Sequence, residues 1–213
     1  MLLSTAYCPP TAWFALAARE MTLSPDRVVP SVVGLEACEN YQKQSYRNRC
    51  YIAGPRGVEM LQFPVVHGSG RCISEIRVDY TTPWILRTER AIDTAYRTSA
   101  YYDYYRDDLF AVFAQRPERL FDLNLAFIRF FLAKTGIACE LRPTAAYAAP
   151  SGDPDDWRER IHPKRPDTVL RDLGLDRPYF QVFSSKYGFL PNLSVMDLLF
   201  NEGPDSILYL KNL

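Results

Sequence analysis

The amino-acid sequence predicts an α/β fold: a mixed sheet that starts with an N-terminal βα unit and carries a helical layer. Three observations predict it. Residues 1–7 are mainly apolar, stop at Pro9-Pro10 and precede a compact apolar stretch, as expected for a strand, a tight turn and a buried helix. Two-residue periodicity then dominates up to residue 80, and helical periodicity dominates from 83 to 136. A two-lobed α+β arrangement is the alternative.

Length and composition favour one domain over residues 1–213. The 25 basic and 25 acidic residues cancel, so no overall field attracts nucleic acid or a membrane. Five cysteines without a CxxC pair, and only two histidines, argue against a disulfide framework and a typical metal site. The apolar first 18 residues have no basic residue before Arg19, which argues against a signal peptide. We expect a cytoplasmic protein; cofactor and oligomeric state stay open.

The elements follow from caps, turns and periodicity. Thr11, Ser99 and Ser194 are expected N-caps, and Gly136 and Gly203 are expected helix stops. Predicted strands cover residues 1–7, 27–33, 40–50, 59–66, 73–80, 139–143, 179–184 and 208–210. Predicted helices cover residues 12–21, 83–96, 100–114, 117–132 and 195–200.

The stretch Asn40–Cys50 has the period of a strand, yet neither of its faces is apolar. Amides, phenols and cations buried without partners cost a few kcal/mol each, so they must face water, each other or a ligand. One interpretation is a solvated edge strand whose charges block aggregation. The other is the lining of a polar pocket for an anionic ligand, because lysine and arginine bind phosphate and carboxylate.

Two further segments carry candidate chemistry. The charged run of residues 155–165 is either a solvated turn or part of a lid that brings Arg158 and Lys164 over a pocket. The C-terminal helix places Asp197 and Glu202 beside strongly apolar residues. A Walker loop, GxGxxG, GxSxG and HExxH are all absent from the sequence.

Three motifs resemble the WbqC-like family of bacteria. They are Tyr7-Cys-Pro-Pro-Thr-Ala-Trp-Phe14, then Tyr41-Gln-Lys-Gln-Ser-Tyr-Arg-Asn-Arg49 with the later Phe63-Pro-Val65 and Trp84, and finally Asn192-Leu-Ser-Val-Met-Asp-Leu-Leu-Phe-Asn-Glu-Gly-Pro204. The third motif is similar to the ending of the shorter, Bacteroidetes-type members. One departure stands out: many members have a histidine about four residues after the helix tryptophan, where this chain has Thr88.

The resemblance implies a place near surface-polysaccharide (O-antigen) genes and a role as a glycine or other amino-acid transferase. We therefore expect an enzyme that adds an aminoacyl or acyl group to an amino sugar or sugar nucleotide. The catalytic candidates are Asp197 and Glu202, with Asp156 as a further possible base. The substrate-binding candidates are Tyr7, Lys43, Tyr46, Arg47, Asn48, Arg49, Arg158, Lys164, Asn192 and Asn201.

A non-catalytic binding or scaffold protein is the alternative, with the same basic and aromatic stretch as its recognition surface. In both cases we expect Asn40–Cys50 to meet the N-terminal Tyr-x-Pro turn and the C-terminal motif. In these three segments the local sequence suits neither a core nor a simple surface.

Overall fold

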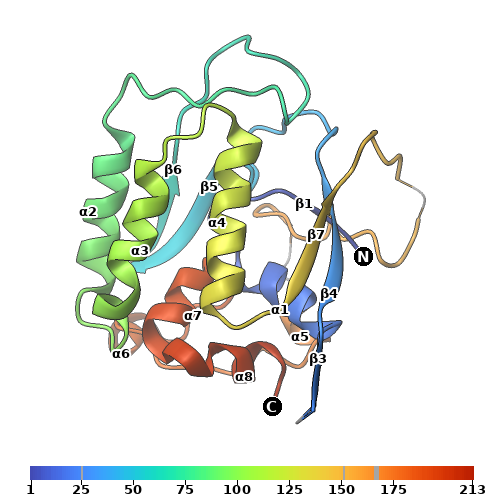
Figure 1. Ribbon diagram of the computed structural model, residues 1–213. Helices are drawn as coiled ribbons and strands as arrows, with labels where there is room; N and C mark the ends of the chain where they lie inside the picture. Colours follow the sequence, from blue (N-terminus) through green and yellow to red (C-terminus); the bar gives the residue numbers. More distant parts are fainter. Residues whose placement is uncertain (25, 151, 166–167) are drawn as a thin grey trace.

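The computed structural model describes residues 1–24, 26–150, 152–165 and 168–213, and it has the expected α/β class (Figure 1). Strands β1 (Leu2–Ser4), β4 (Ser31–Glu36) and β7 (Cys139–Pro143) form a parallel sheet in the order β1-β4-β7. Helix α1 (Thr11–Arg19) follows β1. The N-terminal βα unit is therefore confirmed.

Helix α1 is buried on all sides: Thr11 to Ala18 are all buried. Pro10 at its N-cap offers no side-chain cap, so distant residues satisfy the first amides. The amide of Ala12 donates to Asn192 Oδ1 at 2.9 Å, and the amide of Thr11 donates to the carbonyl of Leu193 at 2.9 Å. The C-terminal motif thus caps the N-terminal helix, which a local reading of Thr11 as the cap did not predict.

The other strands form antiparallel pairs. Strand β2 (Thr22–Ser24) pairs with β3 (Arg27–Val29), and β5 (Arg49–Gly54) pairs with β6 (Gly57–Gln62). The predicted hairpin is therefore present, but only the last two residues of Asn40–Cys50 belong to it. Its turn needs Gly57, whose φ of +97° lies in the region that favours glycine.

The expected helical layer consists of α2 (Trp84–Tyr96), α3 (Tyr102–Ala114) and α4 (Leu120–Lys134). Figure 1 shows the three helices side by side, next to the β5–β6 hairpin. Apolar side chains such as Leu109, Phe113 and Phe127 fill the interior between them. Ser99 does not cap α3; its hydroxyl donates to the carbonyl of Tyr96 at 2.6 Å instead.

Short helices make up the rest: α5 (Val169–Asp172), α6 (Ser184–Tyr187), α7 (Val195–Glu202), the 3₁₀ helix η1 (Gly203–Asp205) and α8 (Ser206–Leu210). Helix α7 begins as predicted, since Ser194 Oγ accepts from the amide of Met196 at 3.4 Å. It ends at Gly203, whose φ is +55°.

Four strand predictions are wrong. Asn40 forms only an isolated bridge, and residues 43–48 form turns, because Gln44 has a φ of +60° and Ser45 Oγ donates to the Gln42 carbonyl at 2.6 Å. Residues 73–80 make only isolated bridges, such as Val65 with Val78. Residues 179–184 contain no strand and end in α6, and residues 208–210 lie in α8. Two-residue alternation does not separate a strand from an extended loop that side chains hold in place.

Among the residues that the structure describes, no helix is long and apolar enough to cross a membrane.

Candidate functional site

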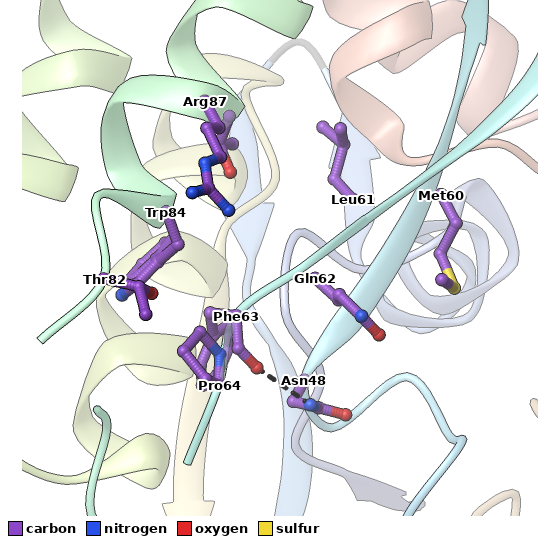
Figure 2. A pocket seen from close by; sticks show the side chains of 10 residues that line it. Asn48, Met60, Leu61, Gln62, Phe63, Pro64, Thr82, Trp84 and Arg87 are labelled. Atoms are coloured by element: carbon purple, nitrogen blue, oxygen red, sulfur yellow. Dashed lines mark hydrogen bonds between the residues drawn. The ribbon is translucent and has the colours of Figure 1, made fainter. Parts of the chain in front are cut away.

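A cavity of about 440 Å³ lies between the end of β6 and the first turns of α2 (Figure 2). We call it the Asn48 cavity. Its lining includes Asn48, Gln62, Phe63, Trp84, Arg87 and Thr88. The cavity lies between the segments that contain Asn48 and Phe63 and the helix that begins at Trp84. In the sequence analysis, only the resemblance to a family linked these segments.

The walls of the Asn48 cavity are held by the hairpin and by aromatic packing. The amide of Phe63 donates to the carbonyl of Asn48 at 3.2 Å, and Asn48 Nδ2 donates to the carbonyl of Phe63 at 2.9 Å. The Trp84 ring lies 5.4 Å from the Phe63 ring and 5.8 Å from the stacked Tyr80 ring, measured between centroids. Trp84, Arg87 and Thr88 have the i, i+3, i+4 spacing that puts side chains on one helix face.

Two buried polar atoms of lining residues have no hydrogen-bond partner among the described residues: Asn48 Oδ1, an acceptor, and Trp84 Nε1, a donor. Buried polar atoms in folded proteins are nearly always hydrogen-bonded, because an unpaired one costs about 1–3 kcal/mol. Both atoms lie within the cavity wall, so a ligand or ordered water would supply the missing partners only if the wall shifted to expose them.

Arg87 adds a positive charge to this cavity. Its side chain is exposed, and no described carboxylate forms an ion pair with it. Figure 2 shows the guanidinium extending from α2 toward β6. An unpaired guanidinium at a cavity is suited to an anionic or strongly polarised oxygen of a ligand.

Tyr7 and Thr88 meet beneath this site. Tyr7 is completely buried, and its ring packs edge-on against Phe63 at 4.9 Å between centroids. Burial raises the pKa of Tyr7 well above its usual value; nearby Thr88 lowers that pKa slightly, although the two hydroxyls do not reach full hydrogen-bond geometry. Burial also raises the pKa of the Cys8 thiol well above its usual value. Both groups therefore stay protonated at neutral pH, and neither is a ready base or nucleophile.

Two predicted ligand cations are instead held in buried ion pairs. Arg47, 1 % exposed, donates to Glu39 at 3.0 and 2.8 Å and to Ser4 Oγ at 2.6 Å. Arg158, 5 % exposed, binds Glu36 at 2.9 Å and Asp156 at 2.6 Å. Ser4 and Glu36 are the last residues of β1 and β4, so both pairs lie at the carboxyl edge of the parallel sheet.

The other predicted cations are more accessible. Lys43 is exposed and lines a second cavity, treated below. Arg49 opens β5 opposite Gln62, and its buried Nε atom has no partner among the described residues. Lys164 is bonded to the side chain of Gln44, so the charged run does reach the Asn40–Cys50 stretch.

The three segments do come together, as expected. The amide of Tyr7 donates to the Tyr46 carbonyl at 2.8 Å, and the amide of Val195 donates to the Pro9 carbonyl at 3.0 Å. A cavity of about 240 Å³ lies at this junction and is lined by Tyr46, Asn192 and His162, among others. The Asn192 carboxamide also caps α1, so part of its hydrogen-bonding capacity serves the fold.

The predicted acids lie elsewhere. Asp197 is fully buried, and its Oδ2 accepts from Tyr179 at 2.7 Å and from Gln181 at 2.8 Å. Burial raises its pKa to about 6, while Tyr179, Gln181 and Tyr96 lower it; Tyr96 stays outside full hydrogen-bond geometry. Asn201 Nδ2 binds the backbone carbonyl of Asp197 at 2.7 Å, and Glu202 ends α7, half-buried. Neither acid lines the Asn48 cavity.

Arg87 and Gln62 were missed by the sequence analysis. A signal for Arg87 was present, because it stands three residues after Trp84 and therefore on the same helix face. Gln62 carried no local signal; its register opposite Arg49 becomes visible only once the hairpin forms. The described residues contain no group of three or more His, Cys, Asp or Glu side chains that could hold a metal ion.

Fold and site together define an α/β protein with a small polar cavity between a hairpin and a tryptophan-led helix. Residues 31–164, more than half of the chain, match the model of the WbqC-like protein family, so the chain belongs to that family. This segment contains every Asn48-cavity residue named above but ends before α7. Comparison with curated proteins and with solved structures gave no match.

Proposed function

We propose that this protein is a transferase of surface-polysaccharide biosynthesis. It would place an aminoacyl group such as glycyl, or another acyl group, on the amino group of an amino sugar or sugar nucleotide. The reaction class rests on the family resemblance. The location rests on the Asn48 cavity, which gathers an unpaired acceptor, an unpaired donor and an unpaired cation.

That combination of groups carries the proposal. Asn48 Oδ1 is suited to accept from a sugar hydroxyl or amine, and Trp84 Nε1 is a donor with free capacity. In acyl transfer, negative charge develops on the carbonyl oxygen, and donors fixed in advance stabilise it. The Arg87 guanidinium and the Gln62 carboxamide are exposed donors among the lining residues, and the indole N–H is a buried donor in the wall.

The chemistry needs few protein groups. The unprotonated amine nitrogen attacks the acyl carbon, a C–N bond forms, and the bond from that carbon to the leaving oxygen or sulfur breaks. The amine proton passes to the leaving group or to water. Because a free amine is already nucleophilic, positioning and oxyanion stabilisation supply most of the catalysis. Asp197 and Glu202 remain candidate general bases, and the burial of Asp197 favours an indirect, positioning role.

A non-catalytic binding protein is the second candidate. It is favoured by the absence of carboxylate and imidazole side chains among the described residues that line the Asn48 cavity. The same contacts would then hold an amino sugar or sugar nucleotide without transforming it.

The test is amide formation followed by mass spectrometry, with aminoacyl and acyl thioesters as donors and nucleotide-linked amino sugars as acceptors. Trp84→Phe keeps the ring stacking but removes the indole donor, so we expect turnover to fall about 100-fold or more. Arg87→Ala should also reduce turnover. Arg90→Ala is the matched control, since it removes an exposed cation from the same helix outside the cavity.

Acceptor binding without amide formation for any donor would favour the binding protein. Equal turnover of Trp84→Phe and the parent would remove the Asn48 cavity as the reaction site.

A further inference from the structure

A second cavity, of about 630 Å³, lies where the Asn40–Cys50 stretch meets the loop that follows β6. We call it the Lys43 cavity. We infer that it binds the phosphates of a small phosphorylated molecule, most specifically a nucleoside diphosphate. The cavity residues that carry this inference are Tyr41, Lys43, Val65, His67, Arg71 and Ile76.

The charges of this cavity are unbalanced. Lys43, His67 and Arg71 are exposed, and none of their side chains has a hydrogen-bond or ion-pair partner among the described residues. No described residue that lines the cavity is acidic. The nearby carboxylate of Glu75 accepts from the backbone amides of Arg71 and Cys72, both at 3.2 Å, and so holds the loop.

The cations are held on segments that backbone contacts join. The amide of Tyr41 donates to the carbonyl of Arg71 at 2.9 Å, and Asn40 forms a bridge with Cys72. Ser69 Oγ donates to the Val66 carbonyl at 2.9 Å and accepts from the Arg77 amide at 3.1 Å, which fixes the loop from within. The backbone segments that carry Lys43 and Arg71 are thus joined before any ligand arrives, so binding does not have to order these segments.

The apolar walls of the Lys43 cavity indicate which chemical group is attached to the phosphates of the ligand. Val65 and Ile76 give apolar surface, and Tyr41 contributes a half-buried ring. A flat apolar group beside an anion fits this arrangement, as in a nucleoside diphosphate. Two cationic side chains plus an imidazole suit the charge of a diphosphate better than a single carboxylate. The zero net charge of the chain gives no long-range attraction for a nucleic acid.

This inference stands without the proposed transferase activity. The two cavities border the same segment, because Pro64 lines the Asn48 cavity and the next residue, Val65, lines the Lys43 cavity.

Titration calorimetry with UDP, inorganic pyrophosphate, uridine and acetate tests the inference. We expect the parent to bind UDP and pyrophosphate and to bind uridine and acetate at least tenfold more weakly. The double variant Lys43→Ala/Arg71→Ala should lose about tenfold in affinity for each cation removed. The control Arg90→Ala/Arg129→Ala removes two exposed cations from α2 and α4 and should bind UDP as the parent does.

Three results would overturn the inference. They are no binding of UDP and pyrophosphate by the parent, equal losses in the two double variants, and acetate binding as strong as pyrophosphate binding. Thermal unfolding of each variant shows that it is folded. Trp84→Phe should keep UDP binding, so failure of the transferase proposal and failure of this one are distinguishable.

Discussion

Lys43 and Arg47 are four residues apart on one polar stretch, and the fold uses them in opposite ways. Arg47 is buried, with two hydrogen bonds to Glu39 and one to Ser4. Lys43 is exposed at a cavity whose described lining has no carboxylate. The same contrast separates Arg158, which is paired with Glu36 and Asp156, from Arg87, which is unpaired at the Asn48 cavity.

The difference shows that residue type alone does not make a binding residue. A cation whose charge is already neutralised by a buried carboxylate has little left to offer a ligand, and removing it leaves the carboxylate uncompensated. A cation without a partner costs little to keep in water and is free to bind. The buried pairs therefore serve the fold at the edge of the parallel sheet, and the unpaired cations mark the candidate sites.

The largest effect is expected for Arg47→Ala. It leaves Glu39 buried without its partner, so the free energy of unfolding should fall by about 3–5 kcal/mol. Lys43→Ala should change it by less than about 0.5 kcal/mol, because the side chain is exposed and unpaired. Urea denaturation measures both. Similar losses in the two variants would contradict the difference between Arg47, which stabilises the fold, and Lys43, which is free to bind a ligand.

A second test concerns the buried carboxyl of Asp197, whose pKa of about 6 lies above the usual value because of burial. The folded protein then keeps a proton that the unfolded chain releases between about pH 4 and pH 6. Stability should therefore fall as pH rises across that range, by about 3 kcal/mol, and this contribution should be constant above it.

Asp197→Asn keeps an acceptor for Tyr179 and Gln181 but carries no charge. Its unfolding free energy should lack that fall and should equal or exceed the parent value at pH 7. Denaturation at a series of pH values provides the comparison. Parallel curves for the two proteins would show that Asp197 does not hold the raised pKa.

A smaller effect than for Arg47 or Asp197 is expected for Tyr7→Phe. The ring packing against Phe63 and Phe127 is kept, and the hydroxyl that is lost has no full hydrogen bond among the described residues. The variant should be as stable as the parent or more stable by up to about 1 kcal/mol. Thermal unfolding of Tyr7→Phe and of the parent measures the difference in stability. A loss above about 2 kcal/mol would mean that the hydroxyl is bonded, with Thr88 as the nearest candidate.

The sequence by itself determined the βα start, the three long helices, the strand Cys139–Pro143 and the capped helix α7. These elements rest on local signals: proline stops, a serine cap, glycine at positive φ, and apolar periodicity. The sequence also identified the three segments that converge, because their polar and aromatic residues suit neither a core nor a simple surface.

Tertiary structure alone decided what the polar residues do. Whether a basic side chain on Asn40–Cys50 binds a ligand depends on which carboxylate comes near it, and Glu39 reaches Arg47 but not Lys43. Asn192 was predicted to bind substrate, and its side chain caps α1 from 180 residues away. Asp197 was predicted to act as a base, and its carboxylate accepts hydrogen bonds from Tyr179 and Gln181. Pairing and burial are long-range properties, because they depend on contacts that form only when distant segments pack together.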